Sequence, residues 1–142
     1  MTSFLAENTG RVLFLHLTKD DDLVKSIIKG CKDAGIETGI VVSAIGSLSR
    51  FHYHYITEGE DIYDVIEAPL ELAAMQGIIL EGIPHLHGVV STEGIKTYSG
   101  HFEEGCLIEY LAEIAIVEVK SPPIGRRKRE NEKISRFEWL EE

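Results

Sequence analysis

The sequence predicts an α+β fold, with a mixed, largely antiparallel β-sheet and one or two packed helices. Most segments between residues 10 and 120 are apolar runs rich in β-branched and aromatic residues and bounded by Gly, Pro, Asp or Ser, which is typical of strands. Residues 23–31 instead repeat apolar side chains at helical spacing. Helical segments do not alternate with strands along the chain, so the pattern disfavours a doubly wound parallel sheet.

The composition is that of one globular domain. The chain has 142 residues, of which 44% are hydrophobic and 27% charged, and a domain of this size buries roughly two thirds of the surface that its unfolded chain exposes. The first residues lack a basic segment followed by an apolar run, and no apolar stretch approaches the roughly 20 residues that span a bilayer. We therefore expect a cytoplasmic protein with no membrane partner. Cys31 and Cys106 form no CxxC pair, so we expect small core residues rather than a disulfide.

The charge is distributed unevenly along the chain. The formal net charge is −10, and residues 1–120 hold 8 Lys or Arg and 19 Asp or Glu, whereas residues 121–142 hold 6 and 5. Nucleic-acid affinity depends on cations that replace counterions on phosphates, so this acidic body disfavours nucleic acid as a partner. We divide the chain into a domain, residues 1–120, and a linker with a C-terminal tail, residues 121–142. The basic run at residues 126–129 predicts the solvated start of a helix in this tail.

The first two elements are a strand and a helix. Residues 10–17 form a β-rich run that predicts a buried strand, and its lone His16 is interpreted as a core or interface group rather than a ligand. An aspartate among residues 20–22 caps a helix of about three turns. Gly35 ends it. The apolar positions of this helix are Leu23, Val24, Ile27, Ile28 and Cys31.

The next segment, residues 38–56, begins as a buried strand and turns polar. Its small residues at 43–49 predict a loop that can line a pocket, with a β-bulge or a turn between strands as the alternative. His52 and His54 then alternate with aromatic residues. This second HxH motif has no third histidine placed beside it by a short hairpin, so we interpret it as the polar face of a strand or an edge of the pocket.

The later segments are also interpreted as strands. Pro69 excludes a helix around it, and residues 71–80 predict a strand with a bend at Gly77. Residues 105–120 are β-rich towards their end and are expected to close the sheet.

An HxH motif at residues 85–87 organises the chemistry of the chain. Side chains alternate faces along a strand, so His85 and His87 point to one side and Leu86 to the other. A tight turn at residues 92–94 predicts an antiparallel second strand, which brings His101 back to the pair.

Three neutral imidazoles with an open fourth position are typical of a catalytic zinc site. The sequence therefore predicts a site for Zn²⁺ or another divalent transition metal at His85, His87 and His101. Gly88 and Gly100 flank the ligands and permit a close approach of the two backbones. The alternative is that these histidines form only the polar face of a strand.

Four blocks of sequence resemble one known family. They are GRVLFLHLTKDDDLVKSI, GIVVSAIGSLS, GIPHLHGVVSTEG and YSGHFEEG, and their order and spacing over residues 10–119 are similar to those of the plant and prokaryote conserved (PPC) domain. The resemblance implies an α+β homotrimer in which His85, His87 and His101 bind a metal, usually zinc. Where the family has GGH, this chain has Ser99, Gly100 and His101. More distantly, the HxH motif followed by a third histidine resembles the zinc site of acetolactate decarboxylase, and this resemblance implies a related fold.

Three classes of function remain open at this point. The first is a homotrimeric metal-binding domain that holds a small-molecule ligand or performs a zinc-dependent reaction. The second is a DNA-binding, transcription-associated regulator. The third is a zinc-dependent lyase or hydrolase, for which Glu103 and Glu104 are the candidate catalytic residues. Glu103 shares the strand face of His101, and Glu104 precedes Gly105 as the family's glutamate does; a solvated turn is the alternative interpretation.

Overall fold

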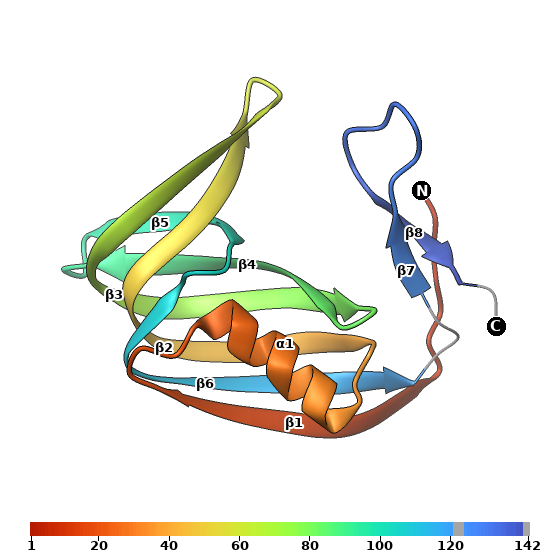
Figure 1. Ribbon diagram of the computed structural model, residues 1–142, viewed down its shortest axis with the longest axis horizontal. Helices are drawn as coiled ribbons and strands as arrows, with labels where there is room; N and C mark the ends of the chain where they lie inside the picture. Colours follow the sequence, from red (N-terminus) through yellow and green to blue (C-terminus); the bar gives the residue numbers. More distant parts are fainter. Residues whose placement is uncertain (121–123, 141–142) are drawn as a thin grey trace.

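The fold is a curled antiparallel sheet covered on one face by a helix (Figure 1). The computed structural model describes residues 1–120 and 124–140. Six strands pair in the order β1-β6-β2-β3-β4-β5, every pairing is antiparallel, and β7 and β8 form a separate two-stranded sheet. The predicted α+β class is confirmed. The elements are β1 (Asn8–Thr18), α1 (Leu23–Ala34), β2 (Gly39–Thr57), β3 (Glu60–Leu80), β4 (Ile83–Thr92), β5 (Lys96–Phe102), β6 (Leu107–Lys120), β7 (Ile124–Arg127) and β8 (Arg136–Trp139).

Helix α1 begins and ends at the predicted residues. The side chain of Asp22 accepts a hydrogen bond from the backbone N–H of Lys25, which satisfies one of the free donors of the first turn. Gly35 takes the left-handed conformation, with φ 66°, and its N–H closes the C-terminus. The helix buries one stripe against the sheet, and no helix among the described residues is both long and apolar enough to cross a bilayer. The buried residues of the stripe are Leu23, Val24, Ile27 and Cys31.

Strands β2 and β3 form a hairpin longer than the sequence predicts. We expected a loop at residues 43–49, but these residues continue β2. Residues 43–45 pair with β6, and Gly46 and Leu48 pair with β6 on one side and β3 on the other. The alternative of a bulge holds, since the register shifts between Val41 and Ser43 and again between Gly46 and Leu48. A Cβ on Gly46 would lie 2.3 Å from the carbonyl oxygen of Leu111, so only glycine fits this crossing.

Pro69 lies within β3 instead of before it. Ala68 and Pro69 oppose the single residue Ser49 at a register shift, and this half of β3 pairs with β2 alone. A proline at a bulge on a strand with one free edge removes no ladder hydrogen bond.

The C-terminal tail contains strands where the sequence predicts a partly helical segment. Residues 124–140 hold β7 and β8, paired from Ile124 with Trp139 to Arg127 with Arg136, and no helix. Phe4 contacts Phe137 and Trp139 at centroid distances of 6.1 and 4.8 Å. This aromatic contact with the N-terminal segment favours a hairpin over an isolated helix.

The hydrophobic core lies between α1 and the sheet. Leu86 of β4 is 1% exposed and points to the helix side, so its neighbours point to the opposite face. Cys31 and Cys106 are buried free thiols in this core, as predicted.

Candidate metal centre

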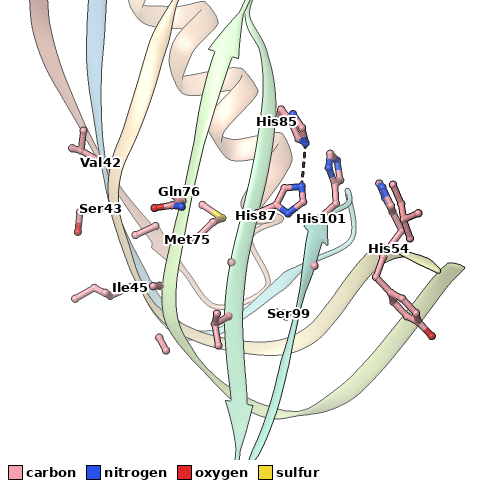
Figure 2. A pocket seen from close by; sticks show the side chains of 18 residues that line it. Val42, Ser43, Ile45, His54, Met75, Gln76, His85, His87, Ser99 and His101 are labelled. Carbon is pink, nitrogen blue, oxygen red and sulfur yellow. Dashed lines mark hydrogen bonds between the residues drawn. The ribbon is translucent and has the colours of Figure 1, made fainter. Parts of the chain in front are cut away.

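Three histidines meet on the sheet face opposite α1 (Figure 2). His85 and His87 lie on β4, and His101 of β5 pairs directly with His87 in the register. One ring nitrogen from each residue lies within 4.8 Å of the others, and the Nε2 atoms of His85 and His87 are 3.1 Å apart. The predicted residues are therefore brought together.

Glycines let the strands approach closely around these histidines. A Cβ on Gly88 would lie 2.5 Å from the carbonyl oxygen of Ala74, and one on Gly100 would lie 2.6 Å from that of His54. The predicted close approach at Gly88 and Gly100 is confirmed, although their neighbours are β3 and β2 respectively. The packing of β5 against both β4 and β2 depends on this absence of side chains.

The surroundings of the three imidazoles favour the neutral form. Loss of solvent around the clustered rings is the main cause that lowers the pKa of His85 and of His87. The same cause lowers the pKa of His101 to about 4, although the Glu103 carboxylate opposes it. Neutral imidazole is the form that binds a metal ion.

The spacing of His85 and His87 fits two ligands of a tetrahedral ion. Zinc–nitrogen bonds of about 2.0–2.1 Å place two ligand nitrogens about 3.3 Å apart. The 3.1 Å between the Nε2 atoms of His85 and His87 is close to this value.

A fourth histidine, His54, joins the cluster from β2. Strand β5 pairs with β2 as well as with β4, and His54 stands opposite His101 in that register. The two rings stack with centroids 4.3 Å apart. His54, His101 and Glu103 form a second group with donor atoms within 4.8 Å of one another. The HxH motif at residues 52–54 was the sign in the sequence that His54 could belong to the site. The β2–β5 pairing that places His54 there joins residues 47 positions apart, so local pattern does not predict it.

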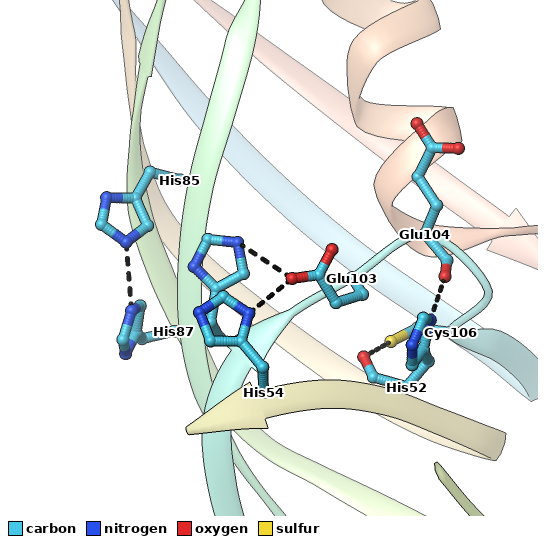
Figure 3. A network of polar contacts seen from close by, with 8 residues as sticks. His52, His54, His85, His87, Glu103, Glu104 and Cys106 are labelled. Atoms are coloured by element: carbon cyan, nitrogen blue, oxygen red, sulfur yellow. Dashed lines mark hydrogen bonds and ion pairs between the residues drawn. The ribbon is translucent and has the colours of Figure 1, made fainter. Parts of the chain in front are cut away.

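The two glutamates that the sequence singled out lie differently (Figure 3). Glu103 Oε1 lies 2.5 Å from His54 Nδ1 and 3.8 Å from His101 Nε2. The carboxylate of Glu104 instead faces α1, 3.8 Å from the Lys25 ammonium, and its backbone carbonyl lies 2.7 Å from the ring of His52. Glu103 is thus part of the cluster, whereas the Glu104 side chain is not.

A cavity of about 950 Å³ adjoins the histidines. Its walls run from Val42 and Ile45 of β2 across β3 to the cluster, and they combine apolar side chains with the imidazoles. Residues 43–45 line this cavity although they are strand rather than loop. A hollow with apolar walls and a few convergent polar groups is suited to a small molecule.

The chain resembles proteins of known family and structure. The model of the family described as the Plants and Prokaryotes Conserved (PCC) domain matches residues 5–120. A plant- and prokaryote-conserved (PPC) protein of Pyrococcus horikoshii is 26% identical, with a TM-score of 0.84 and coverage of 99% of both chains. A metal-containing protein from Archaeoglobus fulgidus is 24% identical, with a TM-score of 0.83 and coverage of 99% of this chain and 100% of the other.

Two further proteins resemble this chain, and their names differ from that of the family. A candidate DNA-binding protein from Bacteroides thetaiotaomicron shares the fold at 18% identity, with a TM-score of 0.77 and coverage of 95% and 96% of the two chains. The bifunctional protein GlmU of Synechococcus sp. (strain JA-3-3Ab) is 32% identical over 108 residues, which is 76% of this chain and 17% of that protein. The chain therefore spans about a sixth of the length of that curated relative.

Proposed function

Because the chain belongs to the Plants and Prokaryotes Conserved domain family, as the match over residues 5–120 shows, we propose that it is a homotrimeric metal-binding domain. His85, His87 and His101 hold one divalent transition-metal ion, with zinc as the first choice because three imidazoles and an open position form its usual catalytic site. The observation that carries the proposal is the convergence of one nitrogen from each ring within 4.8 Å. The metal-containing protein from Archaeoglobus fulgidus, which has the same fold, supports it.

The cavity beside the histidines is the place for a small-molecule ligand. A metal ion held there would supply Lewis-acid chemistry to that ligand. Glu103 is the residue of the chain placed to accept or return a proton next to the cluster, because its carboxylate already contacts His54 and lies near His101. A zinc-dependent lyase or hydrolase reaction is the enzymatic form of this proposal.

Elemental analysis tests the metal site directly. Protein purified without added metal should contain close to one transition-metal ion per chain. His85→Ala, His87→Ala and His101→Ala should each lower this content sharply, since a site left with two protein ligands binds weakly. His16→Ala is the matched control, because His16 lies on β1 in a different hollow of the surface and its loss should leave the metal in place.

The alternative group of ligands has its own signature. If the metal instead lies between His54, His101 and Glu103, then His54→Ala and Glu103→Gln empty the site while His85→Ala and His87→Ala retain the ion. His101→Ala empties the site in both cases.

DNA binding is the second candidate function, and the likeness to the Bacteroides protein supports it. The charges of this chain favour it less. Residues 1–120 are strongly acidic, and two of the four cations in the basic run of the tail are paired: Arg127 with Glu81 at 2.6 Å and Arg129 with Glu138 at 3.2 Å. Cations already paired with carboxylates contribute little to phosphate binding.

A further inference from the structure

A second cavity, of about 530 Å³, adjoins the same histidines. His85 and His87 form part of its wall, and β7 and β8 contribute Arg126 and Phe137. Apolar side chains that include Ile40 and Ile78 complete it. This cavity therefore joins the proposed metal ligands to the C-terminal hairpin.

Arg126 is fixed in the wall of this cavity. Its guanidinium donates to the backbone carbonyl of Ile83 at 3.1 Å and to that of Ile78 at 2.8 Å, at the start of β4 and near the end of β3. The ring of Phe137 lies beneath it, with 5.8 Å from the guanidinium carbon to the ring centroid. These contacts hold the cation in one place before any ligand arrives.

The charge of Arg126 has no carboxylate partner among the described residues. In the same hairpin, Arg127, Arg129 and Arg136 each pair with a glutamate, whereas no ion pair involves Arg126. Its Nε is buried and has no hydrogen-bond partner in residues 1–120 and 124–140. The charge of Glu81 also acts on Arg126, but Glu81 is already paired with Arg127. A half-buried cation held by carbonyl dipoles and a ring face, without an ion pair of its own among the described residues, favours binding of an anion.

The cation shares its cavity with two of the proposed metal ligands, His85 and His87. Guanidinium remains protonated at any pH at which the protein is folded. The cavity thus has a permanent positive charge on one wall, the proposed metal ligands on another, and apolar side chains between them.

We propose that this cavity binds a small carboxylate with a short apolar body. The carboxylate lies between Arg126 and the metal, and the apolar body packs against Ile40, Ile78 and Phe137. This inference rests on the proposed metal site and names the class of ligand that the site takes. A carboxylate suits the cavity better than a neutral molecule because only an anion compensates the guanidinium, and the apolar wall disfavours a fully hydrated ion.

Cobalt-loaded protein provides the test, because the visible spectrum of Co²⁺ changes when a ligand enters its surroundings. Isobutyrate is the probe, and isobutyramide, which has the same shape without the charge, is its control. Isobutyrate should change the spectrum with saturation, and isobutyramide should not. Arg126→Met should weaken isobutyrate binding by at least about tenfold, as expected for loss of a charge-assisted hydrogen bond, at unchanged cobalt content.

Two variants separate a role in binding from a role in folding. Arg129→Met removes the same charge from the same hairpin but breaks only a surface ion pair with Glu138, so isobutyrate affinity should stay at the wild-type value. Ile40→Asp leaves the Arg126 contacts intact and adds a carboxylate to the cavity wall at a side chain that is 43% exposed. Ile40→Asp should weaken isobutyrate binding, so it still tests the proposal if Arg126→Met fails to fold.

The outcomes separate this inference from the proposed metal site. A cobalt spectrum that depends on His85, His87 and His101 but does not respond to isobutyrate overturns the carboxylate site and leaves the metal site standing. Equal isobutyrate affinity in wild type, Arg126→Met and Ile40→Asp also overturns the carboxylate site and leaves the metal site standing. A protein that binds no cobalt overturns both.

Discussion

At the scale of single residues, the contact of Glu103 with two imidazoles is the feature that sequence reasoning could describe only in part. The sequence places Glu103 two residues after His101, just past the end of β5, but it cannot place His54 there. In the structure, Glu103 Oε1 lies 2.5 Å from His54 Nδ1, and the His54 ring stacks on His101. These contacts restrict the orientation of a proposed ligand ring. Groups that orient a ligand in this way contribute to metal affinity without binding the ion themselves.

We therefore expect His54→Ala and Glu103→Gln each to weaken zinc binding by about 10- to 100-fold, without abolishing it. Competition with a chelating indicator dye measures this. His52→Ala is the matched control, since His52 lies two residues away on the same strand and contacts the backbone of Glu104 instead. Wild-type affinity in both variants would show that the orientation of His101 does not depend on them.

Glu118 and Arg11 supply a prediction on pH. Two hydrogen bonds from the Arg11 side chain, one from its backbone N–H and the attraction of its charge lower the pKa of Glu118 to about 2. Because the unfolded chain has a glutamate pKa of about 4.3, the pair stabilises the fold fully above that pH, and the contribution is lost as the pH falls towards 2. The gap in melting temperature between wild type and Glu118→Gln should therefore be largest near neutral pH and should close between about pH 4 and pH 2.

The control for this titration is Glu109→Gln. Glu109 forms a looser ion pair with Lys19, at 3.8 Å, so its removal should change the melting temperature little at any pH. A gap for Glu118→Gln that stays constant down to pH 2 would mean that Glu118 acts through packing rather than charge.

At the scale of elements, the local sequence pattern was sufficient to predict an element when the residues that define it lie within one short segment. Helix α1 has its cap, its apolar stripe and its left-handed glycine within one segment, and all three were predicted. The β4–β5 hairpin likewise carries its turn and its histidines in one short stretch, and the register of His87 with His101 follows.

The prediction was wrong where pairing with distant partners overrides the local pattern. Residues 43–49 are small and polar, which indicates a loop, but their hydrogen-bond partners are on β6 and β3, more than 20 residues away. The tail carries charges typical of a solvated helix, yet the contact of Phe4 with Phe137 and Trp139 accompanies a hairpin. The β2–β5 pairing that brings His54 to the site is of the same kind.

Gly100 tests how far the site depends on that pairing. A methyl group there would lie 2.6 Å from the carbonyl oxygen of His54 and 2.9 Å from the ring of Tyr53, so Gly100→Ala must separate β5 from β2. We expect a loss of about 1–3 kcal/mol in the free energy of unfolding, measured by urea denaturation. Zinc affinity should fall with it, because His101 is the next residue.

Thr97→Ala on the same strand is the control. Thr97 is exposed and pairs with Ser91 at the far end of β5, so its truncation should change stability by less than about 0.5 kcal/mol. A Gly100→Ala protein with wild-type stability and zinc affinity would show that the two strands can separate without cost.

At the scale of the whole molecule, the sheet face opposite α1 exposes an apolar surface that one chain leaves uncovered. Phe14 of β1 is 77% exposed, and Val42 and Ile45 of β2 are 56% and 50% exposed. Ile45 lines both a hollow shared with Phe14 and the large cavity beside the histidines. Adjacent apolar side chains of this size on a sheet face indicate an interface between proteins.

The trimer that we propose would cover this surface with neighbouring copies, and the cavity beside the histidines would then lie at the edge of a subunit interface. Light scattering should give three times the chain mass of 15.9 kDa, and Phe14→Glu should lower it to the mass of one chain because it places a charge within the interface. Ile95→Glu is the control. Ile95 is 82% exposed in the β4–β5 turn, so this substitution should leave the trimer intact.

The three proposed ligands come from one chain, so the Phe14→Glu monomer should still bind one metal ion, while the cavity loses the walls that other copies supply. A mass near 15.9 kDa for the wild type at micromolar concentration would reject the trimer. A monomeric variant without metal would instead show that assembly holds the histidines together.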